Sequence, residues 1–134
     1  MQKIEHIGIA VKDLAVSVPL FEALLNTPCY KTESVESEMV ATAFFKKGES
    51  KIELVQDSNS SGTITKFIEK RGEGIHHIAF DVEDIEAEMK RLQAAGFQLL
   101  HTTPRKGADN KLVCFLHPKS TNGVLVELCQ EIKE

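Results

Sequence analysis

The chain has 134 residues, of which 27% are charged and 42% hydrophobic, and its formal net charge is −4. This balance is typical of one soluble globular domain. The acidic charge argues against a nucleic-acid partner, and no apolar run has the length of a membrane span. Because the N-terminal residues carry no signal or transit pattern, we expect the cytoplasm. The cysteines Cys29, Cys114 and Cys129 lack Cys-x-x-Cys spacing and are expected to be reduced thiols.

The first half of the chain predicts the element order βαβββ. Residues 2–10 alternate between apolar and polar types, which indicates a strand. Apolar residues then recur with helical spacing, at Leu14, Val18, Phe21 and Leu25. Because a proline costs about 3 kcal/mol inside a helix, we expect Ser17 to cap this helix and Pro19 to lie in its first turn. Three strands are predicted next, at 30–36, 39–46 and 51–56, with a hairpin turn at 47–50.

The second half predicts the same order. A turn-rich linker and a short helix fill residues 58–72, and the repeat covers 73–131. Asp84 is predicted to cap a helix that ends at Gly96. Four strands are predicted, at 74–82, 97–102, 111–117 and 124–130. One βαβββ unit leaves a sheet face bare. We therefore expect an α+β fold in which two βαβββ repeats, 1–57 and 73–131, form a curled mixed sheet around a shared metal cleft in a single domain, 1–134.

A repeated motif places one histidine and one glutamate in each half. Residues 4–14, Ile-Glu-His-Ile-Gly-Ile-Ala-Val-Lys-Asp-Leu, return as 75–85, Ile-His-His-Ile-Ala-Phe-Asp-Val-Glu-Asp-Ile. The last strand of each half carries an apolar-Glu-Leu triplet around Glu53 or Glu127. Side chains alternate across a strand, so each histidine faces away from its bulky neighbours and beside small ones.

These donors predict a divalent-metal site. Imidazole nitrogen and carboxylate oxygen suit Zn²⁺, Co²⁺, Ni²⁺, Mn²⁺ or Fe²⁺, and a charged carboxylate in mid-strand is costly without a partner. A lone strand histidine is more often a hydrogen-bonded core residue, but two His/Glu pairs at near-equal spacing favour the metal. The predicted ligands are His6, Glu53, His77 and Glu127. His76 points to the other face of its strand and is interpreted as structural.

The motifs resemble those of the vicinal oxygen chelate superfamily and, within it, the methylmalonyl-CoA epimerase family. The segments that carry the resemblance are 6–11, 48–54, 74–79 and 115–128. It implies paired βαβββ units around one divalent metal held by His6, Glu53, His77 and Glu127, with Co²⁺ as the expected ion and Zn²⁺, Mn²⁺ or Ni²⁺ as alternatives. The second ligand is Gln in some members and Glu here.

The activity that the resemblance implies is interconversion of (2R)- and (2S)-methylmalonyl-CoA by proton removal alpha to a thioester, with the metal stabilising the enolate charge. Epimerisation needs two acid/base groups. Glu127 is the candidate for one role, and Glu38, water or an unidentified group for the other. Some family members place a carboxylate near residues 39–44, where this chain has Thr42, which cannot act as a carboxylate base and is a substrate-binding candidate.

The acyl-CoA substrate implies cationic contacts, and the chain is expected to be a homodimer with neither a nucleic-acid nor a membrane partner. The candidate contacts are Arg105, Lys106, Lys119 and Lys47. Two alternatives keep the fold and change the function. One is a glyoxalase-type lyase or an extradiol dioxygenase, although a dioxygenase prefers two histidines and one carboxylate. The other is a non-enzymatic module that binds a small ligand.

Overall fold

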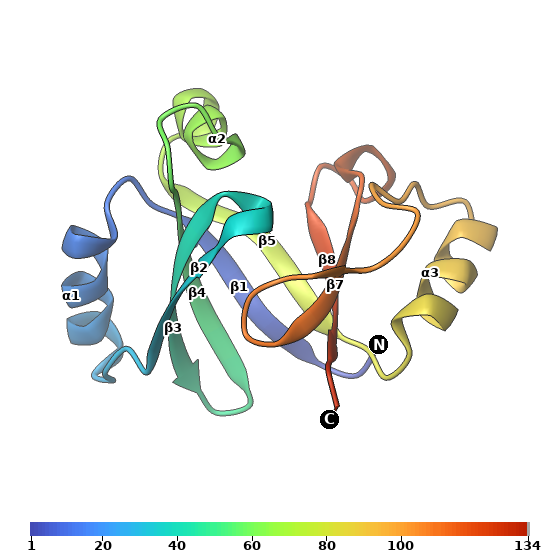
Figure 1. Cartoon of the computed structure of the whole chain (residues 1–134), viewed down its shortest axis with the longest axis horizontal. Helices are drawn as coiled ribbons and strands as arrows, with labels where there is room; N and C mark the ends of the chain where they lie inside the picture. The colour runs from blue at the N-terminus through green and yellow to red at the C-terminus, as the bar shows by residue number, and fades with distance from the viewer. Residues whose placement is uncertain (134) are drawn as a thin grey trace. The chain divides into compact units, whose positions relative to one another are not determined.

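The computed structural model describes residues 1–133, and its class is α+β, as predicted (Figure 1). The chain folds as two compact units. One unit is His6–His76, and the other combines Met1–Glu5 with the chain from His77 onward. The predicted βαβββ order occurs twice, and the strands form both parallel and antiparallel pairs. The single-domain boundary and the shared cleft stay predictions.

The His6–His76 unit is built around a sheet with the strand order β2-β3-β4-β1. Its elements are β1 (Ile4–Ala10) from His6 onward, α1 (Leu14–Leu25), β2 (Lys31–Val35), the 3-10 turn η1 (Glu36–Glu38), β3 (Val40–Lys47), β4 (Ser50–Asp57) and α2 (Thr63–Arg71). β1 pairs with β4 in parallel, and the other pairs are antiparallel. One face of this sheet packs under α1, where Phe45 and Leu54 are fully buried among the apolar residues of the helix. Polar site residues therefore belong to the opposite face.

The start of α1 differs from the prediction. Asp13, not Ser17, caps the helix by accepting a hydrogen bond from the Ala15 N–H at 3.0 Å, and Pro19 lies inside the helix. The proline removes one backbone donor, which is costly in a helix interior. Packing of the apolar stripe against the sheet compensates, because most helical stability in proteins comes from such tertiary burial.

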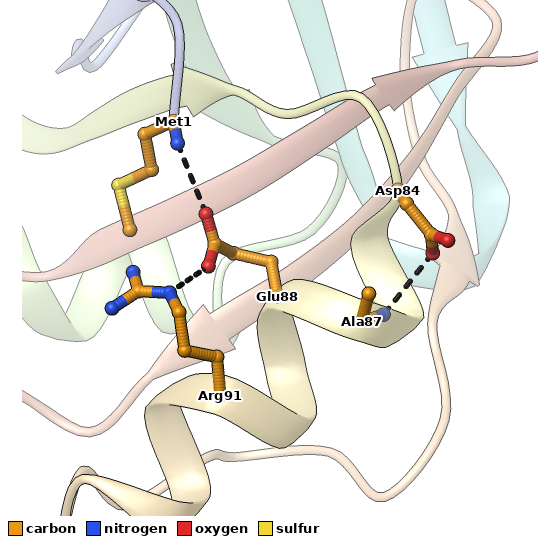
Figure 2. Close-up of polar contacts among 5 residues, drawn as sticks. All are labelled: Met1, Asp84, Ala87, Glu88 and Arg91. Atoms are coloured by element: carbon orange, nitrogen blue, oxygen red, sulfur yellow. Dashed lines mark hydrogen bonds and ion pairs between the residues drawn. The ribbon is translucent and has the colours of Figure 1, made fainter.

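The second unit repeats the arrangement with the strand order β5-β8-β7-β6. Its elements are β5 (Gly74–Asp81) from His77 onward, α3 (Ile85–Ala94), β6 (Arg105–Lys106), β7 (Lys111–Leu116), the 3-10 turn η2 (Pro118–Ser120) and β8 (Val126–Glu131). β5 pairs with β8 in parallel, as β1 does with β4. The predicted cap of α3 is confirmed, since Asp84 accepts from the Ala87 N–H at 3.1 Å (Figure 2).

The predicted strand at 97–102 is wrong. This segment makes one isolated bridge, Leu99 to Leu116, and the strand of the second repeat lies in the predicted loop, at Arg105–Lys106. Phe97 and Leu99 alternate because both pack against the core beneath α3. Two backbone hydrogen bonds, from the Leu100 N–H to the Phe115 carbonyl and from the His117 N–H to the Gln98 carbonyl, flank the single bridge. Pro104, which has no N–H to donate, precedes the short strand that does form. Within residues 1–133, no helix combines the length and the apolar character needed to cross a bilayer.

Candidate metal centre

Each unit contains a buried histidine–glutamate pair. His6 Nε2 lies 3.2 Å from Glu53 Oε1, and His77 Nε2 lies 3.1 Å from Glu127 Oε1. The four residues are only 5% to 6% exposed. A buried carboxylate is unfavourable unless a partner compensates its lost hydration. In each pair the imidazole is such a partner, and the same nitrogen and oxygen atoms are donors that divalent transition metals accept.

Strand register explains why these side chains meet. In the parallel pair of β1 and β4, Glu53 lies opposite Gly8, and in the pair of β5 and β8, Glu127 lies opposite Ala79. Each histidine precedes its small residue by two positions and so shares its face. Because the residue directly opposite each carboxylate is small, the histidine from two residues earlier can reach across to it.

A phenylalanine lies on the other side of each carboxylate. Phe44 is the antiparallel partner of Glu53, and Phe115 is the partner of Glu127. The ring of Phe115 also meets the His77 ring edge-on, with 5.7 Å between the centroids. An apolar wall beside a carboxylate restricts water there, which strengthens the attraction of the carboxylate for a cation.

Sequence reasoning missed a pair of glutamines that tie these strands to the helices. Gln56 Oε1 accepts a hydrogen bond from the Leu14 N–H, and Gln130 Oε1 accepts one from the Ile85 N–H, both at 2.7 Å. Each glutamine follows the site glutamate of its strand by three residues. The duplicated Glu-Leu-x-Gln pattern was the signal that could have identified them.

The acid/base candidate Glu38 and the substrate-binding candidate Thr42 occupy different places. Thr42 is 1% exposed and lies on the face of β3 that carries Phe44, next to the Glu53 position, and its hydroxyl donates to the Glu33 carbonyl at 3.2 Å. Glu38 belongs to η1, after the end of β2, and one of its carboxylate oxygens is buried. The strand register thus places Thr42, and not Glu38, on the sheet face of His6 and Glu53.

The cationic candidates also separate. In β6, Arg105 pairs with Val113 and so shares the face of Glu127, whereas Lys106 pairs with Leu112 on the face that packs toward α3. Lys119 lies in η2, where its backbone N–H donates a hydrogen bond to His117 Nδ1 at 3.0 Å. The Lys47 ammonium donates to Thr27 Oγ1 at 3.0 Å and to the Leu25 carbonyl at 3.3 Å. Lys47 is thus engaged at the C-terminal end of α1.

His76, the neighbour of His77, packs elsewhere. Its ring meets the Phe67 ring of α2 edge-on at 4.9 Å between centroids. The Arg71 guanidinium lies 5.8 Å from the centre of the same Phe67 ring. This contact fits the structural role that was predicted for His76.

The chain is similar to known proteins in sequence and in structure. Residues 5–115 match the model of the Glyoxalase/Bleomycin resistance protein/Dioxygenase superfamily. An uncharacterized Bacillus subtilis protein, YqjC, is 38% identical over 97% of this chain and 93% of its own length. The ethylmalonyl-CoA/methylmalonyl-CoA epimerase of Cereibacter sphaeroides is 38% identical over 96% of this chain and 97% of its own length. A structure of a Streptomyces coelicolor methylmalonyl-CoA epimerase variant in complex with 2-nitronate-propionyl-CoA is 33% identical, covers 99% of each chain and has a TM-score of 0.95.

Proposed function

The chain belongs to the glyoxalase/bleomycin resistance/dioxygenase superfamily, and its relatives include epimerases, a class of isomerase. We propose that it interconverts (2R)- and (2S)-methylmalonyl-CoA. The observation that carries the proposal is the duplicated, buried His–Glu pair. The relative bound to 2-nitronate-propionyl-CoA supports an acyl-CoA substrate for this chain.

We propose that His6, Glu53, His77 and Glu127 together ligate one divalent cation. Two imidazoles and two carboxylates suit Co²⁺, the first candidate, and also Zn²⁺, Mn²⁺ and Ni²⁺. When bound, the ion would supply Lewis acidity for the negative charge that develops on the thioester oxygen.

The remaining steps belong to side chains of the protein. A base must remove the proton alpha to the thioester, and an acid must return a proton to the opposite face of the carbon. We propose Glu127 for one of these roles and retain Glu38 as a candidate for the other. Phe44 and Phe115, as the strand partners of the two glutamates, help exclude water. Thr42, Arg105, Lys106 and Lys119 are the proposed substrate contacts, and Arg105 has the added support of sharing the Glu127 face.

The decisive experiment is proton exchange at the reacting carbon. The purified protein is stripped with a chelator, reloaded with Co²⁺ and incubated with (2R)-methylmalonyl-CoA in D₂O. We expect deuterium at the alpha carbon together with formation of the (2S) epimer. Turnover of a glutathione hemithioacetal without alpha exchange would assign the chain to glyoxalase-type lyases, and acyl-CoA binding without turnover would indicate a binding module.

Adjacent histidines provide a matched pair of variants. His77→Ala should abolish exchange and lower the metal content. His76→Ala removes an imidazole that packs on Phe67 and should leave both unchanged. Equal activity of the two variants would contradict the proposed metal role of His77.

We also propose that the protein is a cytoplasmic homodimer. The three cysteines form no disulfide bonds with one another, which suits a reducing compartment. Light scattering coupled to size-exclusion chromatography measures the oligomeric state directly.

A further inference from the structure

The proposed reaction requires a proton acceptor near the substrate, and the strand register points to a carboxylate on β2. We propose that Glu33, on β2, accepts the proton from the alpha carbon. This inference rests on the proposed epimerase function and deepens it, because it assigns the group that the sequence left unidentified.

The first support is the face on which Glu33 lies. Glu33 is the antiparallel partner of Thr42, and Thr42 is the partner of Val55. Val55 follows Glu53 by two residues, so Glu33, Thr42 and Glu53 share one face of the sheet. With strands about 4.8 Å apart and a rise of about 3.3 Å per residue, the Cα atoms of Glu33 and Glu53 are separated by roughly 12 Å. That span leaves room for two carboxylate side chains with a chelated substrate between them.

The second support is that the other carboxylates of this unit are engaged or displaced. Along the described strands β1 to β4, this face carries Glu33, Glu53 and Asp57. Asp57 is buried and accepts hydrogen bonds from the Ile64 and Thr65 N–H groups at 3.2 and 2.5 Å, so it holds the start of α2. Glu38 lies beyond the end of β2, in η1. Glu33 is therefore the strand carboxylate on this face that is neither a proposed ligand nor a helix cap.

The third support is the immediate surroundings of Glu33. The Thr42 hydroxyl donates a hydrogen bond to the Glu33 backbone carbonyl at 3.2 Å, which fixes β2 at this residue. Because the Thr42 side chain is small, it leaves space for the longer side chain of Glu33. The Lys31 ammonium lies 3.3 Å from Glu33 Oε1 and orients the carboxylate. The Glu33 side chain is 31% exposed, so a proton that it accepts can exchange with water.

The equivalent position of the second unit carries the opposite charge. Arg105 pairs with Val113 in β6 and β7 as Glu33 pairs with Thr42 in β2 and β3. The duplicated scaffold thus presents a carboxylate in one repeat and a guanidinium in the other. A substrate with an acidic carbon needs a base, such as the carboxylate, to accept its proton. If the substrate also carries a carboxylate or phosphate group, it needs a cation, such as the guanidinium, to bind that group.

The step conserves atoms and charge without an additional reactant. The bond between the alpha carbon and hydrogen breaks, and the proton passes to a Glu33 carboxylate oxygen. The electron pair forms the carbon–carbon double bond of the enolate, and the negative charge moves to the thioester oxygen. Protonation of the opposite face by the second acid gives the other epimer. Glu33 then releases its proton to water and the second acid takes one up, which restores both groups.

The test compares three carboxylate-to-amide variants in the Co²⁺-loaded enzyme: Glu33→Gln, Glu38→Gln and Glu36→Gln. Glu36 is an exposed neighbour in η1 and serves as the matched control. We expect Glu33→Gln to lower kcat by roughly 10²- to 10⁴-fold with little change in KM, because a positioned general base contributes about that factor. Metal content and thermal unfolding should match the wild type, and Glu33→Asp should recover part of the lost rate.

The pH profile separates a base from a structural residue. Loss of the base should remove the acidic limb of the kcat profile in Glu33→Gln, while Glu36→Gln keeps the wild-type profile. Wild-type kcat in Glu33→Gln, or a large loss confined to Glu38→Gln, would overturn the assignment of Glu33 and leave the proposed function standing. A wild-type enzyme without alpha-proton exchange would overturn both.

Discussion

Gln56 accepts a hydrogen bond from the backbone N–H of Leu14 at 2.7 Å and so joins the end of β4 to the first turn of α1. Gln130 makes the same bond, at the same distance, to Ile85 at the start of α3. A helix begins with several N–H groups that lack partners within the helix. In each unit, therefore, the strand that carries the site glutamate also provides a hydrogen-bond acceptor for a backbone N–H in the first turn of the helix that covers the opposite face of the sheet.

Removing either glutamine should destabilise its unit without touching the metal pair. We expect Gln56→Ala and Gln130→Ala each to lower the free energy of unfolding by about 1 kcal/mol, because a part-buried N–H loses its acceptor. Urea denaturation measures the change. Gln93→Ala, at an exposed position of α3, is the control and should have little effect. Equal stability of all three variants would show that water replaces the glutamine at no cost.

Substitution of Glu53 tests whether its charge matters for the metal. Glu53→Gln keeps the shape of the side chain and removes one negative charge beside His6. Because a unit charge a few ångströms from a cation contributes at least about 1 kcal/mol, we expect divalent-metal affinity to fall by roughly tenfold with the fold intact. Chelator competition measures the affinity. Unchanged affinity, with a clear loss in His6→Ala, would show that the negative charge of Glu53 does not contribute to metal binding.

Most of the fold could be predicted from the sequence because each motif occurs in both halves of the chain, so that the second occurrence supports the interpretation of the first. The strand containing His6 and the strand containing His77 share apolar alternation and a histidine, and both βαβββ orders are present in the structure. The misplaced strand at 97–102 shows the limit of periodicity. Phe97 and Leu99 alternate because they are partly buried beneath α3, and an apolar pattern indicates burial but not how many bridges a segment forms with its neighbour, which here is one.

The candidate site was only partly predictable for a related reason. The pairing of His6 with Glu53 follows from two local motifs and one parallel register. The place of Glu33 depends on two successive antiparallel registers, β2 with β3 and β3 with β4. A shift of one residue in either pair would move Glu33 to the other face, and loop lengths alone do not determine that register.

The pH dependence of stability should show a contribution from Glu88. Arg91 donates a hydrogen bond to the Glu88 carboxylate, and the Met1 ammonium lies 3.0 Å from its other oxygen (Figure 2). The hydrogen bond from Arg91, followed by that from the N-terminal ammonium, lowers the pKa of Glu88 in the folded state. A carboxylate with a lowered pKa stabilises the fold above its unfolded pKa of about 4.3, and this stability is lost as the pH falls through the folded pKa.

Glu88→Gln should therefore be less stable than the wild type at pH 7 and nearly equal to it at pH 2. Since the Arg91 side chain is 60% exposed, solvent screening limits the difference at pH 7 to about 1 kcal/mol or less. Urea unfolding at both pH values measures it. Glu49→Gln, in the exposed hairpin turn between β3 and β4, is the control. A difference that persists at pH 2 would indicate a packing effect and not the charge.

The three cysteines should differ sharply in reactivity. Burial raises the pKa of the Cys114 thiol, and Cys129 is fully buried, whereas Cys29 is partly exposed and directs its Sγ to the Lys31 carbonyl at 3.3 Å. Because the thiolate is the nucleophile, an inaccessible thiol with a raised pKa reacts slowly. With a thiol reagent such as dithionitrobenzoate at neutral pH, we expect rapid modification of Cys29 alone in the native protein and of all three in urea. Cys29→Ser should remove the rapid phase, and a fast phase that survives this change would show that the core around Cys114 or Cys129 opens readily.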